Sequence, residues 1–94
     1  MSKYKIAHIS QQGQNMIIVP LDSTFDHQSQ STQQETIAAL QMASRSAGLA
    51  GTVVPVWRSG QIMKFIAPRP WLAFFQSLHW NQVMANINKE LTIQ

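Results

Sequence analysis

The sequence contains no cysteine, and its charged side chains are scarce. The lack of cysteine excludes disulfide bonds and thiolate metal sites. Asp, Glu, Lys and Arg make up 12% of the residues, which is about half their usual share in globular proteins. Gln and Ser supply the missing polarity, and a surface of amides opposes self-association less strongly than a charged surface does. The composition therefore favours an oligomer.

Long apolar runs and glycine-rich loops are also missing. The longest apolar run, residues 16–21, is far shorter than the roughly 20 residues that a membrane-spanning helix needs. No apolar run follows Lys3 and Lys5, as a signal peptide would require. The four glycines stand apart from one another, which leaves no phosphate-binding loop. We therefore expect a cytoplasmic protein with no membrane segment and no cofactor.

The excess of positive charge is small and dispersed. Seven Lys and Arg residues stand against four Asp and Glu residues, and the net charge is +3. Strong nucleic-acid-binding proteins gather their cations on one face, whereas here they are spread along the chain. The charge balance permits contact with nucleic acid but does not by itself predict it.

The 94 residues suffice for one domain, residues 1–94, because two separate pieces would each be too small to bury a useful core. Apolar and β-branched runs bounded by turn residues predict strands at residues 4–10, 16–21, 52–58 and 61–67. Hairpin loops are expected at residues 11–15 and 59–60. The continuous apolar run at residues 16–21 is typical of a strand buried on both faces.

Two helical segments complete the prediction. Thr32 and Glu35 have the spacing of a capping box, and the helix after them should run to about Ala47, where Gly48 supplies the left-handed position. The last segment, residues 71–91, carries apolar stripes on two opposite sides of one straight helix. We therefore predict a break or kink between residues 77 and 81, with Ser77 or Asn81 as a possible cap.

These elements predict an α+β fold in the order β-β-α-β-β-α. Because consecutive hairpins usually pair, the simplest assembly is a mostly antiparallel sheet of about four strands. The helices would pack on one face of that sheet.

Residues 22–31 are expected to form a long polar loop, which Phe25 pins against the core. Asp22, Asp26 and His27 lie in this loop and could contribute to a divalent-metal site or an acid/base pair. A metal site needs three or four converging ligands, and nothing nearby in the sequence clearly completes the set. We favour a turn whose Asp and Ser side chains satisfy local backbone groups.

Other catalytic patterns are not evident. His8 and His79 lie within predicted elements, and no nucleophile or carboxylate is placed beside them, so we interpret both as structural. The sequence has no Gly-x-Ser-x-Gly turn. We therefore predict no enzyme.

Cations and aromatic residues alternate around the second predicted hairpin. In the expected register Lys64 lies diagonal to Trp57 and within reach of a cation–π contact, with Arg58, Arg69 and Trp71 close by in the sequence. Such a cluster could stack bases while contacting phosphates, as single-strand-binding proteins do. The competing interpretation places both Trp side chains in the core, with the Lys and Arg stems lying over them.

The predicted sheet and last helix carry more apolar surface than a helix-covered sheet needs. The second face of such a sheet should be polar, and a surplus apolar patch usually marks a contact surface. We predict a homodimer whose interface contains Val53, Trp57, Ile62, Ile66, Trp80, Met84 and Ile87. Alternatively, the C-terminal helix or the long loop folds over the second face and closes a three-layer structure.

The leading hypothesis is therefore a non-enzymatic protein-interaction module that self-associates. The second is an accessory nucleic-acid-binding protein that uses the cluster of cations and aromatic residues around the second hairpin. The third is a metal-dependent or acid/base enzyme centred on the polar loop.

Overall fold

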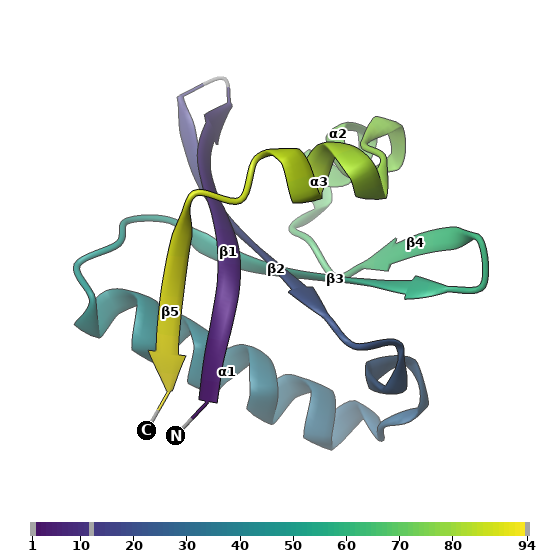
Figure 1. The fold of residues 1–94 in the computed structure, drawn as a ribbon, viewed down its shortest axis with the longest axis horizontal. Helices are drawn as coiled ribbons and strands as arrows, with labels where there is room; N and C mark the ends of the chain where they lie inside the picture. The colour runs from purple at the N-terminus through teal and green to yellow at the C-terminus, as the bar shows by residue number, and fades with distance from the viewer. Residues whose placement is uncertain (1, 12, 94) are drawn as a thin grey trace.

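The computed structural model describes residues 2–11 and 13–93, and within them five strands form one mixed sheet (Figure 1). The spatial order is β4-β3-β2-β1-β5. The β2–β3 pair is parallel, and the other neighbouring pairs are antiparallel. The strands are β1 (Ser2–Gln11), β2 (Gln14–Leu21), β3 (Thr52–Ser59), β4 (Ile62–Phe65) and β5 (Lys89–Ile93).

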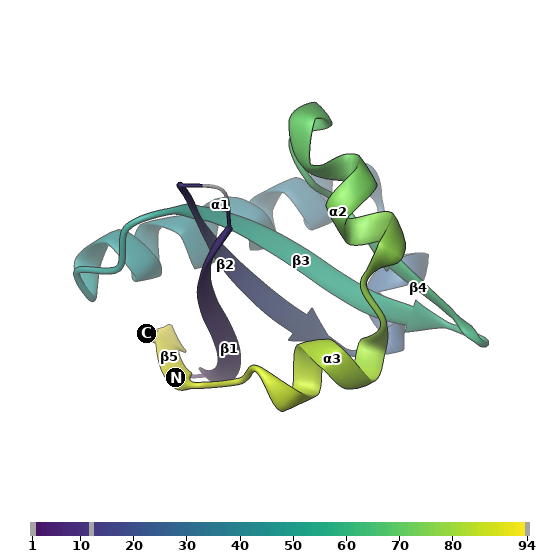
Figure 2. The same ribbon diagram turned by 90° about the horizontal axis from the view of Figure 1, so that it is seen from above.

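Helices cover both faces of this sheet. Figures 1 and 2 show α1 on one face, with α2 and α3 on the other. The helical elements are η1 (Ser23–His27), α1 (Gln30–Ser46), η2 (Arg69–Trp71), α2 (Leu72–Ser77) and α3 (Trp80–Ala85), where η marks a 3-10 helix. The predicted α+β class is confirmed, but the placement of all helices on one face is wrong. The layers follow the three-layer alternative, in which the C-terminal helices cover the second face of the sheet.

The parallel pairing of β2 and β3 was not anticipated. The chain leaves β2, passes through η1 and α1, and returns beside β2 in the same direction, which requires a long crossover connection. Both strands are buried on both faces, as their continuous apolar runs indicate: residues 16–19 and 53–57 are all buried. Three of the four neighbouring pairs are antiparallel, so the expectation of a mostly antiparallel sheet is confirmed in part. The parallel pair at the centre and the fifth strand depart from it.

The two hairpins form close to their predicted positions. Gln11 pairs with Gln14 in the first, and Gln12 of the predicted loop lies outside the described residues. In the second hairpin Ser59 pairs with Ile62, so the two-residue turn lies one position later than expected. Trp57 consequently faces Lys64 directly. This shift moves the register by two residues, so each side chain keeps its predicted face.

The break in the C-terminal segment is confirmed. Helix α2 ends at Ser77 and α3 begins at Trp80, with Leu78 and His79 in extended conformations between them. His79 is the N-cap of α3, where we had expected Ser77 or Asn81. Its backbone N–H donates to Oε1 of Gln82 at 2.8 Å, and its backbone carbonyl accepts the Gln82 N–H at 2.9 Å.

The helical prediction for residues 71–91 is wrong beyond α3. Leu91 lies in the fifth strand, β5, and is buried against the α1 side of the sheet. Periodicity could not separate this short strand from the helix before it, because Leu91 falls on the same helical stripe as Val83.

Helix α1 starts earlier than its capping box suggested. Ser29 is the N-cap, and its Oγ accepts the Thr32 backbone N–H at 3.1 Å. The C-terminus follows the prediction: the Gly48 and Leu49 N–H groups donate back to the carbonyls of Arg45 and Ser44 at 3.0 and 2.9 Å. This is the Schellman arrangement that a glycine after the last turn favours.

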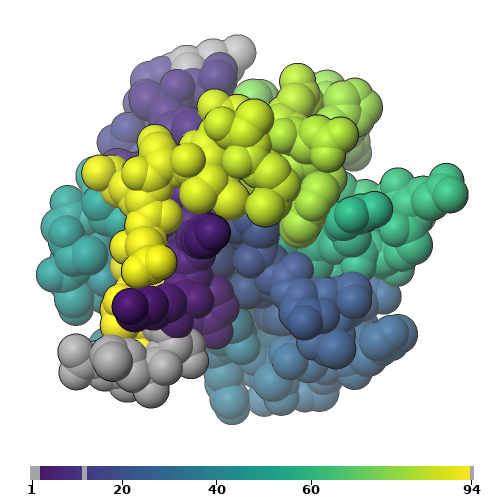
Figure 3. All heavy atoms as spheres, in the orientation of Figure 1, coloured from purple at the N-terminus to yellow at the C-terminus, as the bar shows by residue number. Residues whose placement is uncertain are grey.

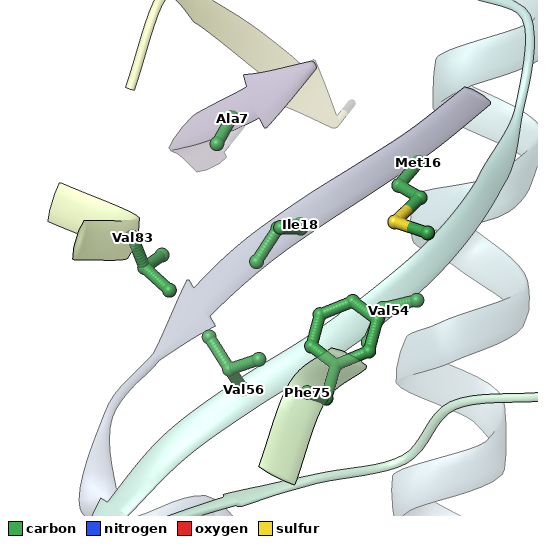
Figure 4. Close-up of a cluster of buried hydrophobic side chains, with 7 residues drawn as sticks. All are labelled: Ala7, Met16, Ile18, Val54, Val56, Phe75 and Val83. Carbon is green, nitrogen blue, oxygen red and sulfur yellow. The ribbon is translucent and has the colours of Figure 1, made fainter. Parts of the chain in front are cut away.

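Two separate cores hold the layers together. The core between the sheet and α2 and α3, drawn in Figure 4, contains Ala7, Met16, Ile18, Val54, Val56, Phe75 and Val83. The core between the sheet and α1 contains Ile6, Ile17, Val19, Leu40, Val53 and Leu91. Alternate residues of β1, β2 and β3 point into opposite cores. Of the residues that we assigned to a dimer, Val53 thus lies in the second core and Trp80 packs against the first.

Gly51 makes the close approach that brings the α1–β3 connection beside the first hairpin. Its φ is +132°, and a Cβ there would lie 2.7 Å from the Asn15 carbonyl oxygen. Gly48 also has a positive φ, +77°, but a Cβ at that position would meet nothing within 4 Å. Substitutions at the two glycines can therefore distinguish the cost of a positive φ, which both share, from the cost of a steric clash, which only Gly51 would incur.

We predict that Gly51→Ala lowers the free energy of unfolding by about 1–3 kcal/mol more than Gly48→Ala does, because only the first substitution forces packed backbone atoms apart. Urea unfolding followed by Trp fluorescence measures both variants. Equal losses for the two variants would show that the approach to Asn15 is not a tight contact.

Candidate functional site

The polar segment before α1 is an ordered 3-10 turn anchored by its aromatic residue. Phe25 is 3% exposed, and its ring meets that of Trp57 edge-on with 4.8 Å between the centroids. The Gln33 side-chain amide, from α1, donates to the Phe25 carbonyl at 2.8 Å. These contacts agree with our expectation that Phe25 pins this segment to the core.

Asp26 connects η1 to the β3–β4 hairpin. One carboxylate oxygen accepts the Trp57 indole N–H at 3.0 Å and the Lys64 ammonium at 3.0 Å. The other accepts the Ser59 hydroxyl at 3.3 Å. The hydrogen bonds from Trp57 and Lys64 lower the pKa of the Asp26 carboxyl group below its ordinary value, because they favour the charged form. Asp26 is therefore a structural anchor for the hairpin.

The other two residues of the predicted metal or acid/base site do not join this network. Asp22 caps η1 by accepting the Thr24 backbone N–H at 3.2 Å, and His27 is exposed. Throughout residues 2–11 and 13–93, no group of three or more His, Asp or Glu side chains is placed to hold a metal ion. Asp22 thus performs the local bonding expected of a turn, whereas Asp26 bonds to the distant β3–β4 hairpin.

The four residues proposed to contact nucleic acid do not form one patch. Arg58 and Lys64 lie on opposite faces of the hairpin, because Arg58 pairs with Met63 and Lys64 with Trp57. Lys64 is bound to Asp26. Arg69 is exposed at the start of η2, and Trp71 is half-buried against the core beneath α2 and α3.

The predicted dimer interface is divided between the core and the surface. Val53 and Trp57 are only 3% and 5% exposed, covered by α1 and η1 within the same chain. Ile62 and Met84 are 66% and 45% exposed. Ile66, Trp80 and Ile87 are half-buried. Two of the seven residues predicted at the interface are therefore internal.

The structure assembles a groove that the sequence did not suggest, which we call the hairpin groove. It lies between the β3–β4 hairpin and the α2–α3 break and has a volume of about 480 Å³. The hairpin tip projects away from the body of the molecule in Figure 3, because β2 pairs with β3 only as far as Trp57. The lining residues are Arg58, Gln61, Ile62, Met63, Phe65, Phe75, Gln76, Leu78, His79, Trp80 and Asn81.

Arg58 dominates the electrostatics of the hairpin groove. Its guanidinium carbon lies 5.8 Å from the centre of the Trp80 ring, a cation–π distance that orients the side chain across the groove. In the part of the chain that the structure describes, no Asp or Glu lines the groove. The ion pairs found there, Lys64–Asp26 and Lys3–Glu90, do not involve Arg58. The groove therefore combines a floor of partly exposed apolar side chains, Met63, Phe65 and Leu78, with a polar rim and one cation that no described carboxylate neutralises.

The comparisons with known proteins add no functional assignment. The chain matches no protein-family model, no curated protein and no solved structure at a significant level. None of the described helices is both long and apolar enough to cross a membrane.

The Asp26 network predicts a specific loss of stability in acid. Because the folded-state pKa of Asp26 is lowered, the unfolded chain takes up this proton at a higher pH, and its stabilisation is lost as the pH falls below about 4. We expect Asp26→Asn to be less stable than the wild type at pH 7 and to lose less further stability on acidification. Urea unfolding at several pH values between 3 and 7 measures both effects.

Asp22→Asn is the matched control, because Asn caps a helical turn as well as Asp does and the Asp26 network stays intact. This control should retain the acid-dependent loss that Asp26→Asn reduces. If the wild type and Asp26→Asn lose stability in parallel as the pH falls, Asp26 is not the group responsible.

Proposed function

We propose that this chain is a protein-interaction module, acting by binding and not by catalysis, whose hairpin groove receives an apolar segment of a partner protein that carries a carboxylate. The observation that supports this most strongly is the position of Arg58, which among the described residues is the one Lys or Arg lining the groove, above the apolar floor. A cytoplasmic location of this chain is part of the same proposal.

The floor provides the apolar part of the binding energy. Met63, Phe65 and Leu78, which are partly exposed, contribute to it, and Ile62 stands 66% exposed at the hairpin tip. Burying one medium-sized apolar side chain of a partner contributes about 1.5–3 kcal/mol before the cost of association. A groove of about 480 Å³ has room for two such side chains.

Arg58 provides selectivity for an acidic group. A guanidinium can donate two parallel hydrogen bonds to one carboxylate, and the Trp80 ring holds this guanidinium in place before a ligand arrives. Gln76, His79 and Asn81 line the same groove and offer further hydrogen-bonding groups. A carboxylate next to apolar side chains matches this arrangement.

Nucleic acid is the weaker candidate for the same groove. Phosphate-driven binding draws on several cations acting together, whereas Lys64 is engaged by Asp26 on the opposite face of the hairpin. Arg58 and Trp80 could still pair a phosphate with a stacked base. The experiment below therefore includes an oligonucleotide.

The probe is a blocked peptide, acetyl-Leu-Phe-Asp-Leu-amide, titrated into ¹⁵N-labelled protein. We expect shifts of the Trp80 indole N–H and the His79 amide, while the Trp57 indole, which is bonded to Asp26, stays unchanged. The Asn analogue of the peptide should bind roughly 10-fold more weakly, because a charge-assisted hydrogen bond contributes about 1.5–3 kcal/mol. Arg58→Ala should remove this preference for Asp.

Arg69→Ala is the matched control, since it removes the same charge from an exposed position outside the groove. It should bind the Asp peptide like the wild type. Equal binding of both peptides by the wild type would contradict the proposed role of Arg58. An oligo-dT that binds with a steep salt dependence, and is weakened by both Arg substitutions, would instead support nucleic-acid binding.

A further inference from the structure

The two edges of the sheet differ in how well they are protected against pairing. Strand β4 has only four residues and carries Lys64 within it, and short strands with charged residues resist the addition of another strand. Strand β5 carries Lys89 and Glu90 at one end but continues through Leu91, Thr92 and Ile93, with no proline. Among the described residues no strand pairs with the outer edge of β5.

A second groove runs along this open edge, and we call it the edge groove. It has a volume of about 690 Å³ and lies between β5 and α1. Four consecutive β5 residues line it, including those whose side chains point to opposite faces of the sheet, so the groove reaches the strand backbone. The α1 wall consists of small residues and one long apolar one: Ala39, Ala43, Ser46, Ala47 and Met42, which is 69% exposed.

We propose that a second copy of this chain occupies the edge groove, adding its own β5 antiparallel to this β5. The result is a sheet that continues through both copies, with both α1 helices on the same side. A two-fold interface requires each surface to fit itself, and an open strand edge satisfies this requirement through its backbone groups alone. The small residues of α1 leave room for Met42 of the second copy.

The charges of β5 select one register. Directly opposed residues share a face, and Leu91 packs on the α1 side of the sheet together with Ile93. A two-fold axis through Leu91 pairs all five residues: Leu91 with itself, Glu90 with Thr92 and Lys89 with Ile93. An axis through Glu90 would oppose two carboxylates, and an axis through Thr92 would pair only three residues.

The face opposite α1 is electrostatically compatible with this register. Glu90 lies 3.9 Å from Lys3 of its own chain, and both side chains are exposed. In the dimer the neutral side chain of Thr92 of the second copy would lie beside Glu90. The interface therefore places no like charges directly opposite each other.

This contact is separate from the hairpin groove, which lies at the other edge of the sheet. Self-association through β5 and peptide binding at Arg58 can therefore be present or absent independently. The contact also differs from the interface predicted from the sequence, because it uses none of the seven residues named there.

Sedimentation equilibrium of the 94-residue chain and two variants tests the proposal. The wild type should show twice the chain mass at micromolar concentrations. Thr92→Glu places a carboxylate opposite Glu90 of the second copy, twice per dimer, and should weaken self-association at least 10-fold. Thr92→Lys places a cation opposite the same carboxylate and should leave it unchanged or tighten it. Thr92 is exposed, and circular dichroism should show both variants folded.

Met42→Glu tests the same surface with a second substitution. It places a charge in the edge groove and should also weaken the dimer. A wild-type chain that stays monomeric up to several hundred micromolar would overturn the proposal. So would a dimer with equal affinity in Thr92→Glu and Thr92→Lys, since opposite charges at this position must act oppositely in the proposed register.

Discussion

The fold depends on two central strands that are apolar on both faces. Residues 16–19 of β2 and 53–57 of β3 are all buried, so neither face of the sheet can be left to solvent. Helix α1 covers one face and the α2–α3 pair covers the other. The break at Leu78 and His79 allows the C-terminal segment to bend across the sheet and then return as β5. The three-layer architecture is thus a consequence of continuous apolar strands in a short chain.

Covering both faces leaves the edges and ends of the sheet as the places where binding surfaces can form. The β3–β4 hairpin extends beyond β2, and Asp26 bonds to Trp57, Ser59 and Lys64 to hold it. That anchor uses the face toward η1, which leaves Arg58 free on the face toward Trp80. Side chains alternate between the two faces of the hairpin. Lys64 therefore points toward Asp26, while Arg58 points toward the hairpin groove, where no described carboxylate neutralises it.

Local patterns in the sequence predicted local structure well and long-range structure poorly. The C-terminus of α1 at Gly48 and the helix break depend on neighbouring residues, and both were found. The anchoring of Phe25 was also found, although its ring packs against the distant Trp57. The parallel β2–β3 pair and strand β5 depend on contacts between distant segments, which periodicity does not report. The hairpin groove was missed because Arg58 meets Trp80 only after the helix breaks and folds back. Trp57 was assigned to an interface because the sequence does not show that η1, which is distant along the chain, covers it.

We propose above all that the hairpin groove is the surface at which this chain binds a partner segment that carries a carboxylate. Amide hydrogen exchange, measured with and without the Asp-containing peptide, tests it without any substitution. The account predicts added protection confined to the β3–β4 hairpin and to residues 76–81, with the central strands exchanging slowly in both states. Protection that appears elsewhere, or an exchange pattern that the peptide leaves unchanged at saturating concentration, would contradict it.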